Sequence, residues 1–240
     1  MSILVRPVSD ADLDQACIIE DAASADIDIN LILFPGPSPP GSQRKRVDSL
    51  IQLRKDDPTV VYLQAIDTAS GRMVAFARFH IYKTPEETQV PIRKLKSELE
   101  TNQKIRNLES DPGTNAEACK VFLLIECLRG NRRWWELDRI SVWRRPDSVC
   151  TSTDEGIDLH MLHTDPEYQG RGAGSVLMEQ IKQSSYELGL PIYLETSTKA
   201  HRLYLKHGFK DLEVVEIDFR PLGGPIYKQP LMMLEVSESR

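Results

Sequence analysis

The chain has 240 residues, of which 40% are hydrophobic and 28% are charged, an ordinary composition for a protein that buries one substantial core. Its formal net charge of −6 gives no general attraction to nucleic acid or to anionic membranes. The longest apolar run, 121–125, is far too short to span a membrane, and the N-terminus lacks the features of a secretory signal. We therefore expect neither a nucleic-acid partner nor a membrane partner.

The four cysteines stand at positions 17, 119, 127 and 150 and form no Cys-x-x-Cys pair or metal-ligand rhythm with histidine. We therefore expect no metal site. Cys119 and Cys127 lie eight apart in an apolar helical run, where core packing is the simpler explanation. This usage of cysteine favours a reducing compartment, the cytoplasm or alternatively the nucleus.

The first 82 residues predict a strand, two helices and a hairpin. Ser9-x-x-Asp12 is a variant of the capping box and predicts the start of the first helix. The proline-rich stretch 35–41 excludes regular structure and predicts a surface linker. In order, the expected elements are a strand at Ile3–Arg6, a helix ending near Ala23, a helix from Ser42 to about Lys55, and strands at Thr59–Ile66 and Met73–Tyr82.

Residues 83–156 are too long for a structureless connection and should carry their own elements. Two helices are expected, Pro91 to Leu108 and Asn115 to Arg129. The basic stretch that follows contains tryptophans at 134, 135 and 143. Arginine interleaved with tryptophan is also found on nucleic-acid surfaces, but the acidic chain favours a packed or substrate-facing patch.

A strand-like segment, Ile157 to His163, is followed by a glycine-rich stretch and then by a helical pattern. Glycines at 170, 172 and 174 let backbone N–H groups turn toward a ligand without interference from Cβ atoms. The first N–H groups of the helix have no intrahelical partner, and the helix dipole adds positive charge there. This turn therefore suits an anionic pyrophosphate.

The glycine spacing by itself is equally consistent with a turn that binds nothing. A Walker loop is excluded because no Gly-Lys-Ser/Thr follows, and a Rossmann turn fits poorly because the motif comes late in the chain. The downstream residues decide between these alternatives. They comprise a β-rich run at Leu190–Thr196, the motifs Ala200-x-x-Leu203-Tyr204 and Gly208-Phe209, and two closing strands at Leu212–Phe219 and Pro230–Val236.

With Gln169-x-x-Gly172-x-Gly174, these motifs make the chain resemble the GCN5-related N-acetyltransferase (GNAT) superfamily. The specific motifs cover residues 157–210, and the order of elements extends the resemblance weakly to the N-terminus. The resemblance implies an α/β (α+β) fold with a mixed, mostly antiparallel central sheet, flanking helices, and fourth and fifth strands that splay apart. We expect residues 1–240 to form a single domain with a helical, family-atypical insertion at 83–156.

The resemblance implies acetyl-CoA as acyl-donor cosubstrate. Its pyrophosphate would meet the turn, and its pantetheine arm would pair with the backbone at the end of the fourth strand. Thr164 stands where many members have valine, which main-chain binding tolerates. The implied cofactor-binding residues are Leu162, His163, Thr164, Gln169, Gly170, Arg171, Gly172, Ala173, Gly174 and Ser175.

Two polar residues on the predicted central strand are candidates for proton removal. Asp158 and His160 are two apart and so share one face. We expect His160 to be the base, because its ordinary pKa is about 6.5, with Asp158 orienting it or relaying through water. A structural polar pair remains the alternative. His163 points away by alternation unless a bulge intervenes, and Glu195 is a secondary candidate.

Tyr204 occupies the position where many members of the superfamily place a tyrosine near the CoA sulfur. A phenol can donate a proton to the departing thiolate. The alternative is an amphipathic core tyrosine with its hydroxyl at the rim. The family often has an asparagine three residues before Ala200, and this chain has Ser197 there, which leaves the local hydrogen bonding open.

The function implied is acetyl-CoA-dependent N-acetylation of a primary amine, by direct transfer in a ternary complex. A small-molecule acceptor is expected, because the proline-rich loop near Phe34 and the insertion should close the acceptor pocket. The alternatives are acetylation of a protein N-terminus or lysine, and a non-catalytic acyl-CoA-binding module. A monomer and a homodimer are both consistent with the sequence.

Overall fold

Seven strands form one sheet in the order β1-β2-β3-β4-β5-β7-β6 in the computed structural model, which describes residues 2–84, 86–87, 113–122 and 155–236. Neighbouring strands are antiparallel except β4 and β5, which are parallel. This mixed sheet confirms the predicted fold class. The strands are β1 (Ile3–Pro7), β2 (Val60–Asp67), β3 (Met73–Tyr82), β4 (Gly156–Thr164), β5 (Ile192–Glu195), β6 (Lys210–Asp218) and β7 (Ile226–Leu234).

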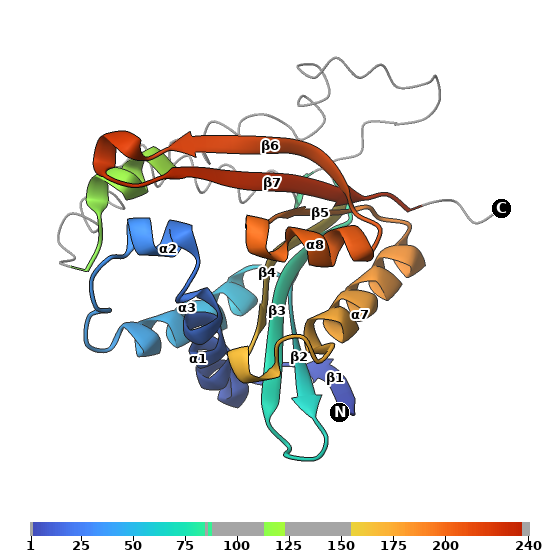
Figure 1. Cartoon of the computed structure of the whole chain (residues 1–240). Helices are drawn as coiled ribbons and strands as arrows, with labels where there is room; N and C mark the ends of the chain where they lie inside the picture. The colour runs from blue at the N-terminus through green and yellow to red at the C-terminus, as the bar shows by residue number, and fades with distance from the viewer. Residues whose placement is uncertain (1, 85, 88–112, 123–154, 237–240) are drawn as a thin grey trace, which may run out of the picture.

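Helices cover both faces of this sheet (Figure 1). The α-helices are α1 (Leu13–Ser24), α2 (Asp28–Leu33), α3 (Ser42–Asp56), α7 (Ala173–Leu188) and α8 (Thr198–Lys206), and the 3-10 helices are η1 (Asp10–Asp12), η3 (Pro166–Tyr168) and η4 (Arg220–Leu222). The sequence did not predict α2, because six residues span fewer than two turns and show no clear period. The strand β7 begins four residues before the predicted Pro230.

The predicted capping box is present at the start of the first helical segment. The Asp12 carboxylate accepts hydrogen bonds from the Ser9 N–H, at 3.0 Å, and from the Ser9 hydroxyl, at 2.7 Å. The cap opens the 3-10 turn η1, however, and α1 begins only at Leu13.

The two faces of the sheet bury separate hydrophobic clusters. The helix α7 and Tyr204 of α8 pack on one face, in a cluster that includes Leu177, Ile181 and Phe79. The helices α1 and α3 cover the other face, where Leu13 and Phe76 are fully buried. The strands β6 and β7 extend beyond these layers and carry a third cluster against α2 and residues 118–122.

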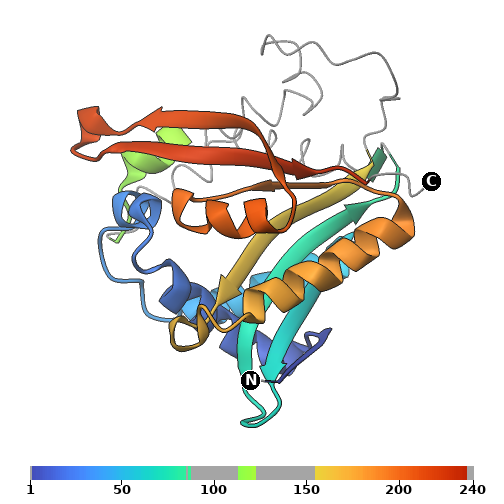
Figure 2. The same ribbon diagram turned by 45° about the vertical axis from the view of Figure 1, so that its right-hand side comes forward.

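The strands β4 and β5 part after a short paired stretch. The strand β4 pairs with β3 along its whole length, from Gly156 to Thr164. It pairs with β5 only at residues 157–159, and β5 continues along β7 (Figure 2). Residues 161–164, called the open edge below, therefore have no strand partner on the β5 side. This confirms the predicted splay.

A β-bulge stands at the point where the strands part. Arg78 pairs with Met161 and Phe79 with Leu159, so His160 is the extra residue on β4. The bulge changes the alternation downstream, and His163 pairs with Phe76, on the face covered by α1. The sequence predicted that His163 would point away from Asp158 and His160 unless a bulge intervened, and this bulge intervenes.

The insertion is described only at its ends and at residues 113–122. Residues 116–122 are helical, within the predicted helix Asn115–Arg129, and Ala118 and Cys119 are buried. The predicted helix Pro91–Leu108, the three tryptophans, Cys127 and Cys150 lie outside the described residues. Within the described parts of the chain, no helix combines the length and apolar character needed to cross a membrane.

Candidate active site

The glycine-rich turn between β4 and α7 is held against the end of β4. The Gln169 side-chain amide donates to the Thr164 carbonyl at 3.2 Å. Gly170 and Gly172 have φ angles of 72° and 92°, in the left-handed region that side chains disfavour. Gly172 is also the N-cap of α7.

Four successive backbone donors at this turn are unused. The N–H groups of residues 172–175 donate to no residue that the structure describes. They lie in the first turn of a 16-residue helix, where the dipole favours negative charge. A group of phosphate oxygens fits such a set of donors.

Gly174 allows α7 to pack closely against the open edge. A Cβ atom at this position would lie 3.2 Å from the Thr164 hydroxyl oxygen, tighter than ordinary contact. A larger side chain would therefore push the first turn of α7 away from β4. The glycine couples the position of the free N–H groups to that of the open edge.

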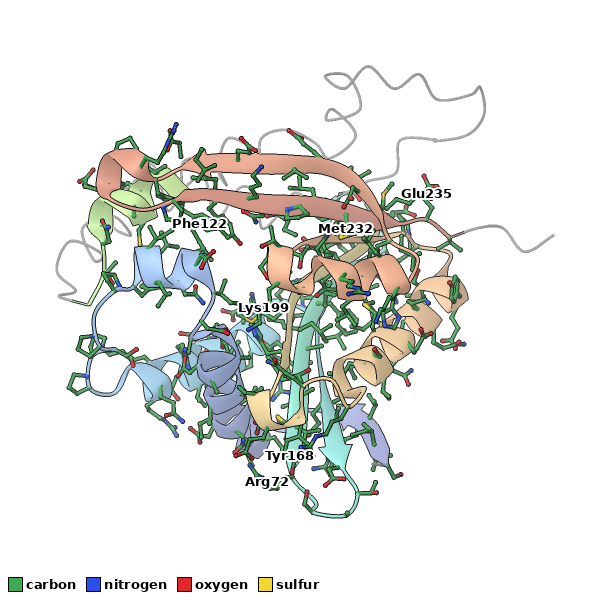
Figure 3. The ribbon with its side chains drawn as sticks, viewed as in Figure 1. Arg72, Phe122, Tyr168, Lys199, Met232 and Glu235 are labelled. Carbon is green, nitrogen blue, oxygen red and sulfur yellow. The ribbon has the colours of Figure 1, made fainter. Side chains whose placement is uncertain are left out.

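Two arginines lie beside this turn, and Arg72 is also 3.7 Å from an Asp165 carboxylate oxygen. The Arg171 and Arg72 guanidinium carbons lie 5.3 and 5.9 Å from the centroid of the Tyr168 ring. Figure 3 shows Arg72 and Tyr168 next to each other, beside the lower part of the β2–β3 hairpin. The sequence did not single out Arg72, which comes from the turn before β3 and carries no local signal.

Asp158 and His160 are in contact on the face of the sheet covered by α1. The His160 Nε2 atom lies 3.3 Å from an Asp158 carboxylate oxygen, and the side chains are 38% and 35% exposed. Burial opposes ionisation of Asp158, but His160, His80 and Arg78 together lower its pKa. Asp158 is therefore a carboxylate at neutral pH.

A second histidine, which the sequence did not single out, packs against this pair. The rings of His80 and His160 have centroids 4.7 Å apart, and His80 stands opposite Asp158 in the β3–β4 register. The His80 Nδ1 atom lies 2.9 Å from the Thr59 hydroxyl, which is 2.6 Å from an Asp57 carboxylate oxygen. We call the side of β3 and β4 that carries Arg78, His80, Asp158 and His160 the polar face.

Hydrogen-bond chemistry assigns the tautomer of His80. A carboxylate only accepts, so the single hydroxyl hydrogen of Thr59 goes to Asp57. Thr59 must then accept from His80, which places the ring hydrogen on Nδ1 and the lone pair on Nε2. Burial and the neighbouring His160 lower the pKa of His80 to about 4, so this ring is neutral at neutral pH.

Glu20, also missed from the sequence, reaches this region from α1. Burial raises the pKa of its carboxyl group, partly opposed by Arg46 and Arg78. The spacing of apolar residues along the helix could have predicted that Glu20 faces inward. Glu20 lies seven residues after Leu13 and three before Ala23, which are both buried, and so shares the inward face of α1.

Tyr204 lies on the opposite side of the sheet from the polar face. It is 6% exposed, and its ring makes an edge contact with Phe209 at 5.6 Å. Burial raises the pKa of its hydroxyl, which keeps the phenol protonated.

Glu195 is not brought into contact with the Asp158–His160 pair by any bond among the described residues. Its two carboxylate oxygens accept from the Tyr193 hydroxyl, at 2.9 Å, and from the Gln229 amide, at 2.5 Å. The bond from Gln229 joins β5 to β7, whereas the bond from Tyr193 lies within β5.

A pocket of about 440 Å³ opens beside α1. It is lined by Glu20, by Phe34 and its proline-rich neighbours, and by Arg46 at the start of α3, but by no residue of β4 or β5. Lys199 of α8, labelled in Figure 3, binds Asp26 between α1 and α2 at 2.6 and 2.7 Å. This ion pair links the two halves of the sheet across the side where β4 and β5 part.

Comparison with known proteins identifies this arrangement. Residues 138–211 match the family described as the acetyltransferase (GNAT) domain. The likeness to this domain thus covers the segment that contains the open edge, the glycine-rich turn and Tyr204. A 66-residue segment is 39% identical to the uncharacterized N-acetyltransferase YedL of Escherichia coli (strain K12) and covers 25% of this chain and 42% of that protein. The match thus spans less than half the length of this relative.

Solved GNAT structures share the fold over the whole chain. Arylalkylamine N-acetyltransferase 2 from Aedes aegypti aligns with a TM-score of 0.62 and 16% identity, covering 99% of this chain and all of that one. The Salmonella typhimurium protein yncA, solved with its cofactor acetyl-CoA, aligns with a TM-score of 0.54 and 12% identity, covering 99% and 96%. At these identities the likeness establishes the GNAT fold of this protein.

Proposed function

We propose that this protein is an acetyl-CoA-dependent N-acetyltransferase that acetylates the primary amine of a small molecule by direct transfer. The observation that carries this proposal is the open edge of β4, which leads directly into a turn with four unused N–H groups. A splayed strand end can pair with an extended ligand, and the turn can hold the phosphates at its end.

The structure fits acetyl-CoA at this place, and the cosubstrate supplies an acetyl group activated as a thioester. The backbone of Leu162, His163 and Thr164 would hold the pantetheine arm in place of a strand. The N–H groups of residues 172–175 would hold the pyrophosphate, and the charge of Arg171 favours an anion there. Because these contacts use backbone atoms, they tolerate Thr164 at the strand end.

His160 is the proposed general base. It removes a proton from the acceptor amine as the nitrogen attacks, and the ionised Asp158 at 3.3 Å stabilises the imidazolium that results. His80 remains neutral and therefore does not repel that charge. A backbone N–H near Leu162 is the proposed donor to the oxyanion of the tetrahedral intermediate.

Tyr204 is the proposed proton donor to the departing thiolate. Its buried hydroxyl stays protonated, as a donor must. When the tetrahedral intermediate collapses, the C=O bond re-forms, the C–S bond breaks, and the departing thiolate takes the phenol proton. None of the cysteines lies in the motif region 157–210, which favours direct transfer over an acyl-cysteine intermediate.

The experiment that tests this function measures CoA release from acetyl-CoA with a panel of amines, polyamines, amino acids and peptides. Wild type is run beside His160→Ala, Tyr204→Phe and the surface control Tyr186→Phe. Release that depends on a small amine and falls in the first two variants supports the proposal. Turnover of peptides alone indicates a protein acetyltransferase, and binding of acetyl-CoA without turnover of any acceptor indicates a non-catalytic module.

A further inference from the structure

Arg78 occupies the middle of the polar face. On β3 it alternates with Phe76 and His80, which places its side chain on the side covered by α1. Its partner on β4 is Met161, the residue after the bulged His160 and the first residue of the open edge. Arg78 is thus one strand, about 4.8 Å, from the place where the sheet opens.

The guanidinium of Arg78 has no counter-ion in contact. Among the described residues it makes no ion pair or hydrogen bond, and its buried Nε atom lacks a partner. The partly buried Arg46, by contrast, binds Asp21 at 2.5 and 2.8 Å, although its Nε atom also lacks a partner. A partly buried charge without a partner is costly, which makes Arg78 an exception that needs a reason.

The acidic groups nearest to Arg78 do not neutralise it directly. Asp158 is in contact with His160, and burial raises the pKa of Glu20, which weakens Glu20 as an anion. The remaining groups that feel its charge are His80 and Tyr82 on β3, Tyr62 on β2, and His163 on β4. All four are neutral at neutral pH.

We propose that Arg78 binds a carboxylate of the acceptor, so that the acceptor is an amino acid rather than a simple amine. This inference rests on the proposed N-acetyltransferase function. A guanidinium presents parallel N–H donors that match the two oxygens of a carboxylate. With the amine at His160, a carboxylate a few bonds away falls on the side of the neighbouring strand, where Arg78 lies.

The test compares amino acids with their decarboxylated amines, for example tyrosine with tyramine and lysine with cadaverine. The variants are Arg78→Met, Arg78→Lys and the surface control Arg220→Met. We expect kcat/KM of wild type to be at least about 10-fold higher for an amino acid than for its amine. Loss of a charged hydrogen-bonding pair should lower kcat/KM for the amino acid about 10- to 100-fold in Arg78→Met, mainly through KM, and leave the amine within about 3-fold. Arg78→Lys should recover part of the loss.

Equal use of both members of each pair by wild type overturns the inference. So does an equal fall for both in Arg78→Met, because Arg78 would then serve the reaction centre or the packing. Calorimetric binding of acetyl-CoA checks that the variants are folded.

Calorimetry with N-acetyltyrosine and N-acetyltyramine separates this inference from the function on which it rests. We expect N-acetyltyrosine to bind wild type at least about 10-fold more tightly than N-acetyltyramine does, and to lose that advantage in Arg78→Met. Binding that depends on Arg78, without turnover of any acceptor, supports the carboxylate site and overturns the transferase activity. Turnover of amines without such binding supports the transferase activity and overturns the carboxylate site.

Discussion

The candidate sites on the two sides of β4 differ in the groups that form them, backbone on one side and side chains on the other. On the open edge and the adjoining turn, the candidate binding groups are backbone N–H and C=O groups, and the side chains mainly have to be small. On the polar face, the candidate groups are side chains contributed by α1, β3 and β4. A cofactor bound by main chain depends on local geometry, whereas an acceptor bound by side chains depends on the packing of distant segments.

The two sites also differ in how far apart in the sequence their residues lie. The open edge and the turn lie within residues 161–175, so one strand, one turn and one helix start suffice. The polar face joins Glu20, His80 and His160, which are separated by 60 or more residues. The open edge and the turn can be recognised from residue spacing, whereas the polar face exists only after the sheet has formed.

The largest expected effect is on the polar face. His160→Ala should lower kcat about 100- to 1000-fold, because it removes the proposed base, and leave the Kd for acetyl-CoA unchanged. Steady-state kinetics and calorimetry measure the two quantities, and Tyr186→Phe, on the exposed side of α7, is the control. A comparable loss of acetyl-CoA affinity would contradict the separation of the two sides.

Acid should destabilise the folded chain through two histidines on the side of the sheet covered by α1. Burial lowers the pKa of His80 and of His163 to about 4, helped by His160 and by Arg78 respectively. Between about pH 6.5 and about pH 4 the unfolded chain binds protons that the folded chain does not, so stability is complete above this window and falls with pH through it. Across this window the free energy of unfolding should fall by an amount on the order of 3 kcal/mol for each histidine.

Urea unfolding at neutral pH and near the lower limit of that window measures this loss. His163→Phe should flatten the dependence on pH. An unchanged slope in His163→Phe would show that the ring is protonated in the folded protein.

On the cofactor side, Gly174→Val should weaken acetyl-CoA binding about 10- to 100-fold. The new side chain meets the Thr164 hydroxyl and displaces the first turn of α7 from the open edge. Gly189→Ala is the matched control at the other end of the same helix, where a Cβ atom meets nothing within 4 Å. Its positive φ should cost about 1 kcal/mol of stability without changing the Kd. Equal Kd values for the two variants would break the comparison.

Tyr204→Phe should lower kcat about 10-fold, because only the hydroxyl is lost and the ring still packs against Phe209. The matched control is Tyr186→Phe on the exposed side of α7. An acetyl thioester donor whose thiol has a lower pKa needs no proton donor when the thiol leaves, so it should restore most of the rate in the variant. A loss that persists with such a donor would point to packing rather than proton donation.

The smallest effect is expected at Glu195. Glu195→Gln keeps one acceptor for the Tyr193 hydroxyl and should change kcat/KM by less than about 3-fold. A loss close to that of His160→Ala would restore Glu195 as a candidate base and contradict the structural role described above.

The sequence by itself determined the cofactor side of this protein. Gln169, Gly172 and Gly174, with Tyr204 and Gly208-Phe209, predicted the GNAT fold, the splayed strands and the start of α7. These features are local or nearly so, because a helix start and a left-handed turn depend on residues within a few positions of each other. The contact between Asp158 and His160 also followed from the period of a strand.

Only the tertiary structure decided the composition of the polar face. Arg78 and His80 are the polar residues of β3, which is otherwise apolar and largely buried, but their role depends on which helix covers them and which residues lie opposite. The bulge at His160, which sets the side of His163, depends on the register between β3 and β4. Register and helix packing are long-range properties, and one chain read in order does not contain a local signal for them.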